Sequence, residues 1–107
     1  LRAALETTLA YSQLTSDGLC CGNLGRAEIL LRAYEALGEE GLLRGAEEIA
    51  TRAVARSREQ GGDYLWSGKA DGRFVPSFFT GAAGVGYALL RLARPSLLPC
   101  VLALEAC

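Results

Sequence analysis

The stretches Cys21-Gly22-Asn23-Leu24-Gly25 and Thr80-Gly81-Ala82-Ala83-Gly84 share the pattern x-Gly-x-x-Gly at a distance of 59 residues. Each follows a loop-like segment and precedes an apolar run with helical spacing. A two-helix unit that repeats predicts stacking, because one helical hairpin cannot bury both of its helices alone. We expect the first glycine to allow an unusual turn and the second to allow close approach of the helix start. Because the chain contains 13 glycines, two chance matches are the alternative explanation.

The apolar spacing predicts helices over about residues 1–14, 24–37, 42–58 and 82–93. In the second helix, Glu28 and Arg32 are assigned to the polar side as a favourable i,i+4 pair, and Gly38 predicts a left-handed cap. The fourth carries a single charge, Arg91, and a helix that is apolar all round is normally buried on every side. Residues 60–77 predict a long loop or short hairpin, and the tail after Pro95 predicts at most one more helical turn. No parallel-sheet or sandwich pattern is visible, so the predicted class is all-α.

Composition narrows the classes of protein that are possible. The chain has 107 residues, 50% of them hydrophobic, and a net charge of −1, which fits at most one soluble domain and argues against disorder. There is no basic excess for nucleic acid and no apolar run that could span a membrane. The count of 0 Met and a start at Leu1 suggest a piece of a longer protein, and 0 His removes the usual neutral-pH acid or base.

The adjacent thiols Cys20 and Cys21 are the outstanding chemical feature. A disulfide between neighbours would form a strained ring, whereas on a turn both thiolates could bind one metal ion, with zinc favoured. The spacing differs from the usual Cys-x-x-Cys, and burial as ordinary core thiols is the alternative. Cys100 and Cys107 are predicted to be ordinary thiols. A disulfide framework is disfavoured because the composition is helical and Leu-rich and no secretion signal is visible in the sequence, which predicts reduced thiols in the cytoplasm.

Other candidate residues have a structural explanation that is preferred. Residues 81–86 superficially resemble a phosphate loop but lack the preceding strand and the Gly-Lys-Ser/Thr ending, so a packing role is expected. Glu39-Glu40 and Glu47-Glu48 are expected on solvated faces. Phe78 and Phe79 are expected to anchor their loop in the core, and Tyr64 and Trp66 could line the rim of a cleft.

Two segments, residues 19–26 (Leu-Cys-Cys-Gly-Asn-Leu-Gly-Arg) and 76–92 (Pro-Ser-Phe-Phe-Thr-Gly-Ala-Ala-Gly-Val-Gly-Tyr-Ala-Leu-Leu-Arg-Leu), resemble the C-terminal end of class II lanthipeptide synthetases. In these LanM-type enzymes the C-terminal half is a LanC-like lanthionine cyclase. The ending Pro95-Ser96-Leu97-Leu98-Pro99-Cys100-Val101-Leu102 also fits the family's terminal pattern. The resemblance implies part of an α/α toroid, a double ring of helices with glycine-rich loops leading into the inner helices.

The resemblance also implies a zinc site. Its ligands would be Cys20 and Cys21, which correspond to the pair that the family has as Cys-His or Cys-Cys before a glycine, and a third cysteine upstream of Leu1. The implied reaction is zinc-assisted addition of a peptide cysteine thiolate to dehydroalanine or dehydrobutyrine, which gives lanthionine or methyllanthionine. The acid/base groups would also lie upstream, as would an N-terminal dehydratase that uses ATP and Mg²⁺. Three thiolates on Zn²⁺ would give a net −1 site and a more nucleophilic bound sulfur than an imidazole ligand would.

We therefore expect residues 1–107 to be the C-terminal fragment of such a cyclase, inactive and poorly soluble alone. The implied partners are a precursor lanthipeptide and the rest of the fragment's own toroid, with any membrane association through transporter partners. Two alternatives remain. One is another α/α-toroid enzyme, such as a glycosidase or terpenoid cyclase, although the acidic motifs of these enzymes are missing. The other is a non-catalytic LanC-like or helical-repeat binding protein with core cysteines.

Overall fold

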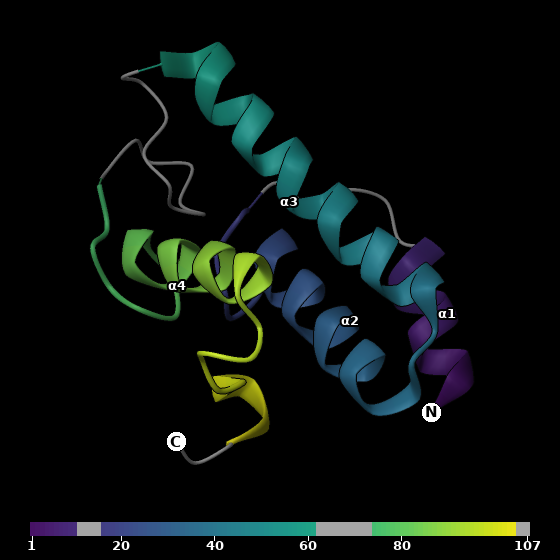
Figure 1. The fold of residues 1–107 in the computed structure, drawn as a ribbon. Coiled ribbons are helices and arrows are strands. Elements are labelled where there is room, and N and C mark those ends of the chain that lie inside the picture. Colours follow the sequence, from purple (N-terminus) through teal and green to yellow (C-terminus); the bar gives the residue numbers. More distant parts are fainter. Residues whose placement is uncertain (11–15, 62–73, 105–107) are drawn as a thin grey trace.

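Four α-helices and one short 3-10 turn form the regular structure of residues 1–10, 16–61 and 74–104, the parts that the computed structural model describes (Figure 1). In chain order they are α1 (Arg2–Ala10), α2 (Asn23–Leu37), α3 (Glu40–Gln60), α4 (Ala82–Ala93) and the turn η2 (Val101–Ala103). These described ranges contain no strand. The predicted all-α class is confirmed.

The helix ends lie close to where local sequence signals place them. Gly38 ends α2 with φ of 70°, and its N–H donates to the carbonyl of Tyr34 at 2.7 Å, which is the predicted left-handed cap. The cap at Arg94 ends α4 directly before Pro95, and the predicted last helical turn is η2. The remainder of the predicted first helix and most of the predicted hairpin, with Tyr64 and Trp66, lie outside the described residues.

Helix α2 is the centre of the packing. It contacts α1, α3 and α4, and α3 lies along it as the long teal helix of Figure 1. Its fully buried side chains, Leu24, Leu30 and Leu31, belong to the same core cluster as Ala46, Ala50 and Ala53 of α3. Small residues allow the two helices to approach closely. The predicted amphipathic character of α3 is confirmed, since Glu47 and Glu48 are exposed on its other side.

Helix α4 departs from the prediction for a helix that is apolar all round. Its single charge, Arg91, is 1% exposed, whereas Leu90 beside it is 63% exposed. The assignment of Glu28 to the polar side of α2 was also wrong, because Glu28 is 2% exposed and pairs with Arg91. The apolar spacing identifies the helices correctly but misassigns Glu28, because Arg91 supplies the partner that makes its burial possible.

The internal repeat is confirmed in three dimensions. The Asn23 N–H donates to the Ser16 carbonyl, and the Ala82 N–H donates to the Val75 carbonyl, both at 2.8 Å. Adding 59 to either residue number of the first pair gives the second pair. These bonds join the first residues of α2 and α4 to the start of the loop that precedes each helix. We call residues 16–22 the cysteine loop and residues 75–81 the second loop.

The glycines of both repeats are required by close packing rather than by an unusual turn. Gly22 and Gly81 have φ of −118° and −141°, which other residues also adopt, so the expectation of an unusual turn was wrong for them. A Cβ on Gly22 would meet backbone at 2.4 Å, and one on Gly81 would meet the Val75 carbonyl at 2.0 Å. At Gly25 and Gly84 it would meet a loop carbonyl at 2.1 and 1.7 Å. The expected packing role of the glycine run is confirmed for Gly81 and Gly84.

Candidate metal centre

The two adjacent thiols lie on the turn that leads into α2. Both Cys20 and Cys21 are free and exposed, and their Sγ atoms are 3.3 Å apart, within hydrogen-bonding distance of each other. Neither side chain is buried in the apolar core, the alternative that the sequence left open. The pKa of Cys20 is raised by this hydrogen bond and by repulsion from a Cys21 thiolate. Without a metal, therefore, the pair resists losing its second proton.

The chemistry of the pair fits a soft divalent ion. Two thiolates at about 2.3 Å from a tetrahedral zinc are about 3.8 Å apart, so a small side-chain rotation from 3.3 Å would suffice. Within residues 1–10, 16–61 and 74–104 no group of three or more His, Cys, Asp or Glu side chains is arranged to hold a metal. The described residues thus offer two thiol ligands and would need others to complete a structural or catalytic site.

A buried acid anchors the cysteine loop. Asp17, 5% exposed, accepts a hydrogen bond from the Asn23 side-chain amide at 2.8 Å and forms an ion pair with Arg56 of α3. The Gly18 N–H donates to the Ser16 hydroxyl at 3.2 Å. The loop is therefore attached both to the first residue of α2 and to α3. Sequence analysis did not identify Asp17, because it lies six residues before the first residue of α2, too far away to be recognised as a capping residue.

The second loop lies against the cysteine loop. The backbone N–H of Cys20 donates to the carbonyl of Phe79 at 2.8 Å, across 59 residues of sequence. Phe78 is half-buried and stacks edge-on against Tyr87 with ring centroids 5.4 Å apart, whereas Phe79 is 53% exposed. The prediction that both phenylalanines anchor the loop is confirmed for Phe78 and wrong for Phe79. The Phe79 side chain faces solvent while its carbonyl holds Cys20.

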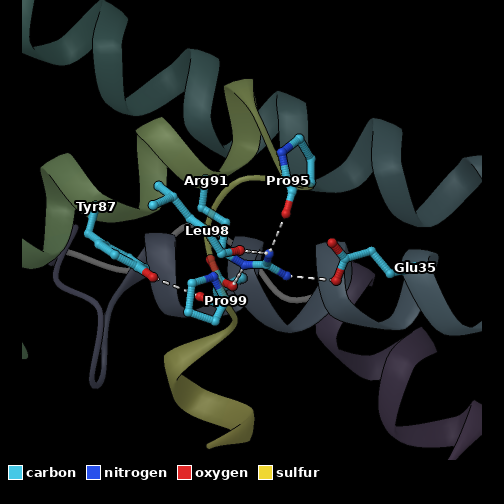
Figure 2. A network of polar contacts seen from close by, with 7 residues as sticks. Glu35, Tyr87, Arg91, Pro95, Leu98 and Pro99 are labelled. Carbon is cyan, nitrogen blue, oxygen red and sulfur yellow. Dashed lines mark hydrogen bonds and ion pairs between the residues drawn. The ribbon is translucent and has the colours of Figure 1, made fainter. Parts of the chain in front are cut away.

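A buried ionic network fixes the tail that follows Arg94 to α2 and α4. Arg91 of α4 pairs with Glu28 and with Glu35 of α2, the latter at 2.7 Å. Its guanidinium also donates to the carbonyls of Pro95 and Leu98 at 3.2 and 2.7 Å (Figure 2). Burial alone would lower the pKa of Arg91, but the hydrogen bonds and charges of Glu35 and Glu28 raise it above its ordinary value. Arg91 therefore stays charged and holds the tail against α2.

The other thiol of the described residues, Cys100, belongs to this network. It is 1% exposed, and its pKa is raised by burial and by hydrogen bonding to Glu28. Its expected role as an ordinary buried thiol fits this environment, while Cys107 lies outside the described residues. The hollow of about 90 Å³ between α2 and α3 is lined by Arg26, Arg52 and Arg56 among others, and contains neither Cys20 nor Cys21. None of the described helices is both long and apolar enough to cross a membrane.

Comparison with known families agrees with this geometry. Residues 1–103 match the family described as lanthionine synthetase C-like protein. The chain belongs to the lanthionine synthetase C-like family. Searches of curated proteins and of solved structures found no match. Within the LanC-like family, the resemblance drawn from the two glycine-rich segments is confirmed, and the all-helical arrangement is consistent with part of an α/α toroid.

Proposed function

We propose that this chain is the C-terminal part of a LanM-type lanthionine cyclase and that Cys20 and Cys21 supply two thiolate ligands to its zinc. The observation that carries the proposal is the pair of exposed free thiols with Sγ atoms 3.3 Å apart, on the turn that leads into α2. The family match over residues 1–103 supports it. A third ligand would come from a cysteine outside this chain. With no imidazole present, this would give a site of three sulfurs.

In the proposed reaction the thiol of a precursor peptide adds across the double bond of dehydroalanine or dehydrobutyrine. The sulfur bonds to the β-carbon and a proton is delivered to the α-carbon, which leaves a thioether. A zinc ion would lower the pKa of the bound peptide thiol so that it reacts as the thiolate. Cys20 and Cys21 would hold the ion at a solvent-accessible loop, fixed by Asp17 and by the Phe79 carbonyl. The proton donor would be supplied from outside residues 1–107.

The exposed apolar side chains support membership of a larger ring. Ile29 on α2, Leu90 on α4 and Leu97 in the tail are 48%, 63% and 68% exposed. Each lies on an element whose other side is buried, so we propose that further helices of the same toroid cover them. The residues 1–107 alone should then oligomerise or precipitate, and a sharp, cooperative melt of a monomer would contradict this part of the proposal.

The test uses the full-length protein and a dehydrated precursor peptide that retains its cysteines. Cyclisation consumes free thiols without changing peptide mass, so it is measured as loss of N-ethylmaleimide adducts in the mass spectrum. We expect Cys20→Ser and Cys21→Ser to abolish this loss, while the control Cys100→Ser, at a buried thiol beside Glu28, retains it. Wild-type rates in both loop variants would refute the proposal. A non-catalytic LanC-like binding protein, the second candidate, would consume no thiol in any variant.

A further inference from the structure

The second loop copies the backbone of the cysteine loop but carries different side chains. At the repeat distance of 59 residues, Phe79 and Thr80 occupy the positions of Cys20 and Cys21. The hydrogen bonds that join the two ends of each loop, from Asn23 to Ser16 and from Ala82 to Val75, have the same length, 2.8 Å. In both repeats the second glycine, Gly25 or Gly84, has no room for a Cβ because the carbonyl six residues before it lies too close. The second loop thus has the shape of the thiol-bearing loop without its thiols.

The two loops contact each other through their equivalent residues. The Cys20 N–H donates to the Phe79 carbonyl at 2.8 Å. The loops also meet beside this bond, since a Cβ on Gly18 would lie in ordinary van der Waals contact with the Phe79 carbonyl oxygen, at 3.5 Å. A Cβ on Gly84 would lie 1.7 Å from the Phe78 carbonyl and 3.2 Å from the Cβ of Leu19. The position of α4 therefore sets the position of the second loop, and the second loop sets the backbone of Cys20.

We propose that the second loop is a positioning element for the thiol pair, an inference that rests on the proposed function. The Phe79 carbonyl fixes the amide of Cys20 and hence the direction of its Cα–Cβ bond, and Cys21 follows one residue later. The loop is itself held by the contact between the Ser77 and Thr80 hydroxyls at 2.8 Å and by the ring of Phe78 against Tyr87. Metal affinity should therefore depend on residues that touch neither sulfur.

The experiment compares two alanine substitutions on the same helix of the full-length protein. Gly84→Ala forces the second loop to move, whereas Gly86→Ala is a matched control, because a Cβ there meets nothing within 4 Å. Co²⁺ is titrated into the metal-free proteins, the sulfur-to-cobalt charge-transfer band is recorded, and zinc affinity is obtained by competition. Disturbing residues that orient metal ligands costs about 10- to 100-fold in affinity, and we expect that loss with an altered band for Gly84→Ala only. Affinities and bands that agree for the two variants would overturn the inference.

A milder pair of variants decides the question if Gly84→Ala does not fold, as judged by circular dichroism. Thr80→Val removes the hydroxyl that contacts Ser77 and keeps the shape of the side chain, whereas Thr80→Ser keeps the hydroxyl. Because Thr80 is exposed, neither substitution changes the packing of the core. We expect several-fold weaker zinc binding for Thr80→Val and wild-type binding for Thr80→Ser. Equal binding by both overturns the inference. A wild-type protein that binds no Co²⁺ through Cys20 and Cys21 refutes the proposed function itself, and this inference with it.

Discussion

Replacement of Arg91 by methionine should show how strongly the stability of α2, α4 and the tail after Arg94 depends on one buried charge. Arg91 and Glu28 have side chains only 1% exposed, so Arg91→Met leaves a buried carboxylate without its cation. The variant can escape by protonating that carboxylate. For a glutamate with an ordinary pKa of about 4.3, this costs about 3.7 kcal/mol at pH 7 and about 1 kcal/mol at pH 5. Loss of the bonds to the Pro95 and Leu98 carbonyls adds to the cost.

We therefore expect Arg91→Met to lower the free energy of unfolding by about 4 kcal/mol at pH 7, within the range measured for broken buried pairs, and by about 2.7 kcal/mol less at pH 5. The assay is urea unfolding followed by circular dichroism at both pH values. Adding Glu28→Gln should recover much of the loss at pH 7 and remove its pH dependence. The control is Arg52→Met, whose partner Glu48 is 61% exposed and whose cost should stay below about 1 kcal/mol. Equal costs for Arg91→Met and Arg52→Met would refute the reasoning.

Three further predictions follow from the same contacts. Iodoacetamide should label Cys100 far more slowly than Cys20 and Cys21 in the metal-free protein, because Cys100 is buried whereas the other two thiols are exposed; peptide mapping would show the order, and comparable rates would contradict its burial. The raised pKa of Cys100 also means that the folded state holds its proton more tightly. Its contribution to stability is therefore present below the ordinary value of 9.0 and is lost as pH rises through the folded pKa, and Cys100→Ala should flatten this decline in alkaline unfolding curves. Cys21→His should slow alkylation of the zinc-bound peptide thiol, since an imidazole donates less charge than a thiolate, and equal alkylation rates would show that the third sulfur does not matter.

The helices and the thiol pair were accessible from the sequence because their signals are local. Apolar spacing, a glycine cap and a proline stop are read within a few residues, and the adjacent cysteines are visible without any structure. The repeat at 59 residues was visible for the same reason, although the role of its first glycine was not. Close packing on a carbonyl and an unusual φ both favour glycine, and only coordinates distinguish them.

The missed features all involve partners that are distant in sequence. Arg91 and Glu28 lie 63 residues apart, and Arg56 and Asp17 lie 39 apart, so no helical period pairs them. The lone charge in an otherwise apolar helix was nevertheless a signal, because such a residue is buried only with a partner. The Phe79 carbonyl that holds Cys20 is a backbone group, and its role does not depend on the phenylalanine side chain. Sequence patterns therefore carried no information about it.

The zinc content of the purified full-length protein tests the central claim most directly. Elemental mass spectrometry of the wild type should give one zinc per chain, and each of Cys20→Ser and Cys21→Ser should lose most of it, while Cys100→Ser keeps it. One zinc retained by both single variants would contradict the claim that these two adjacent sulfurs hold the ion.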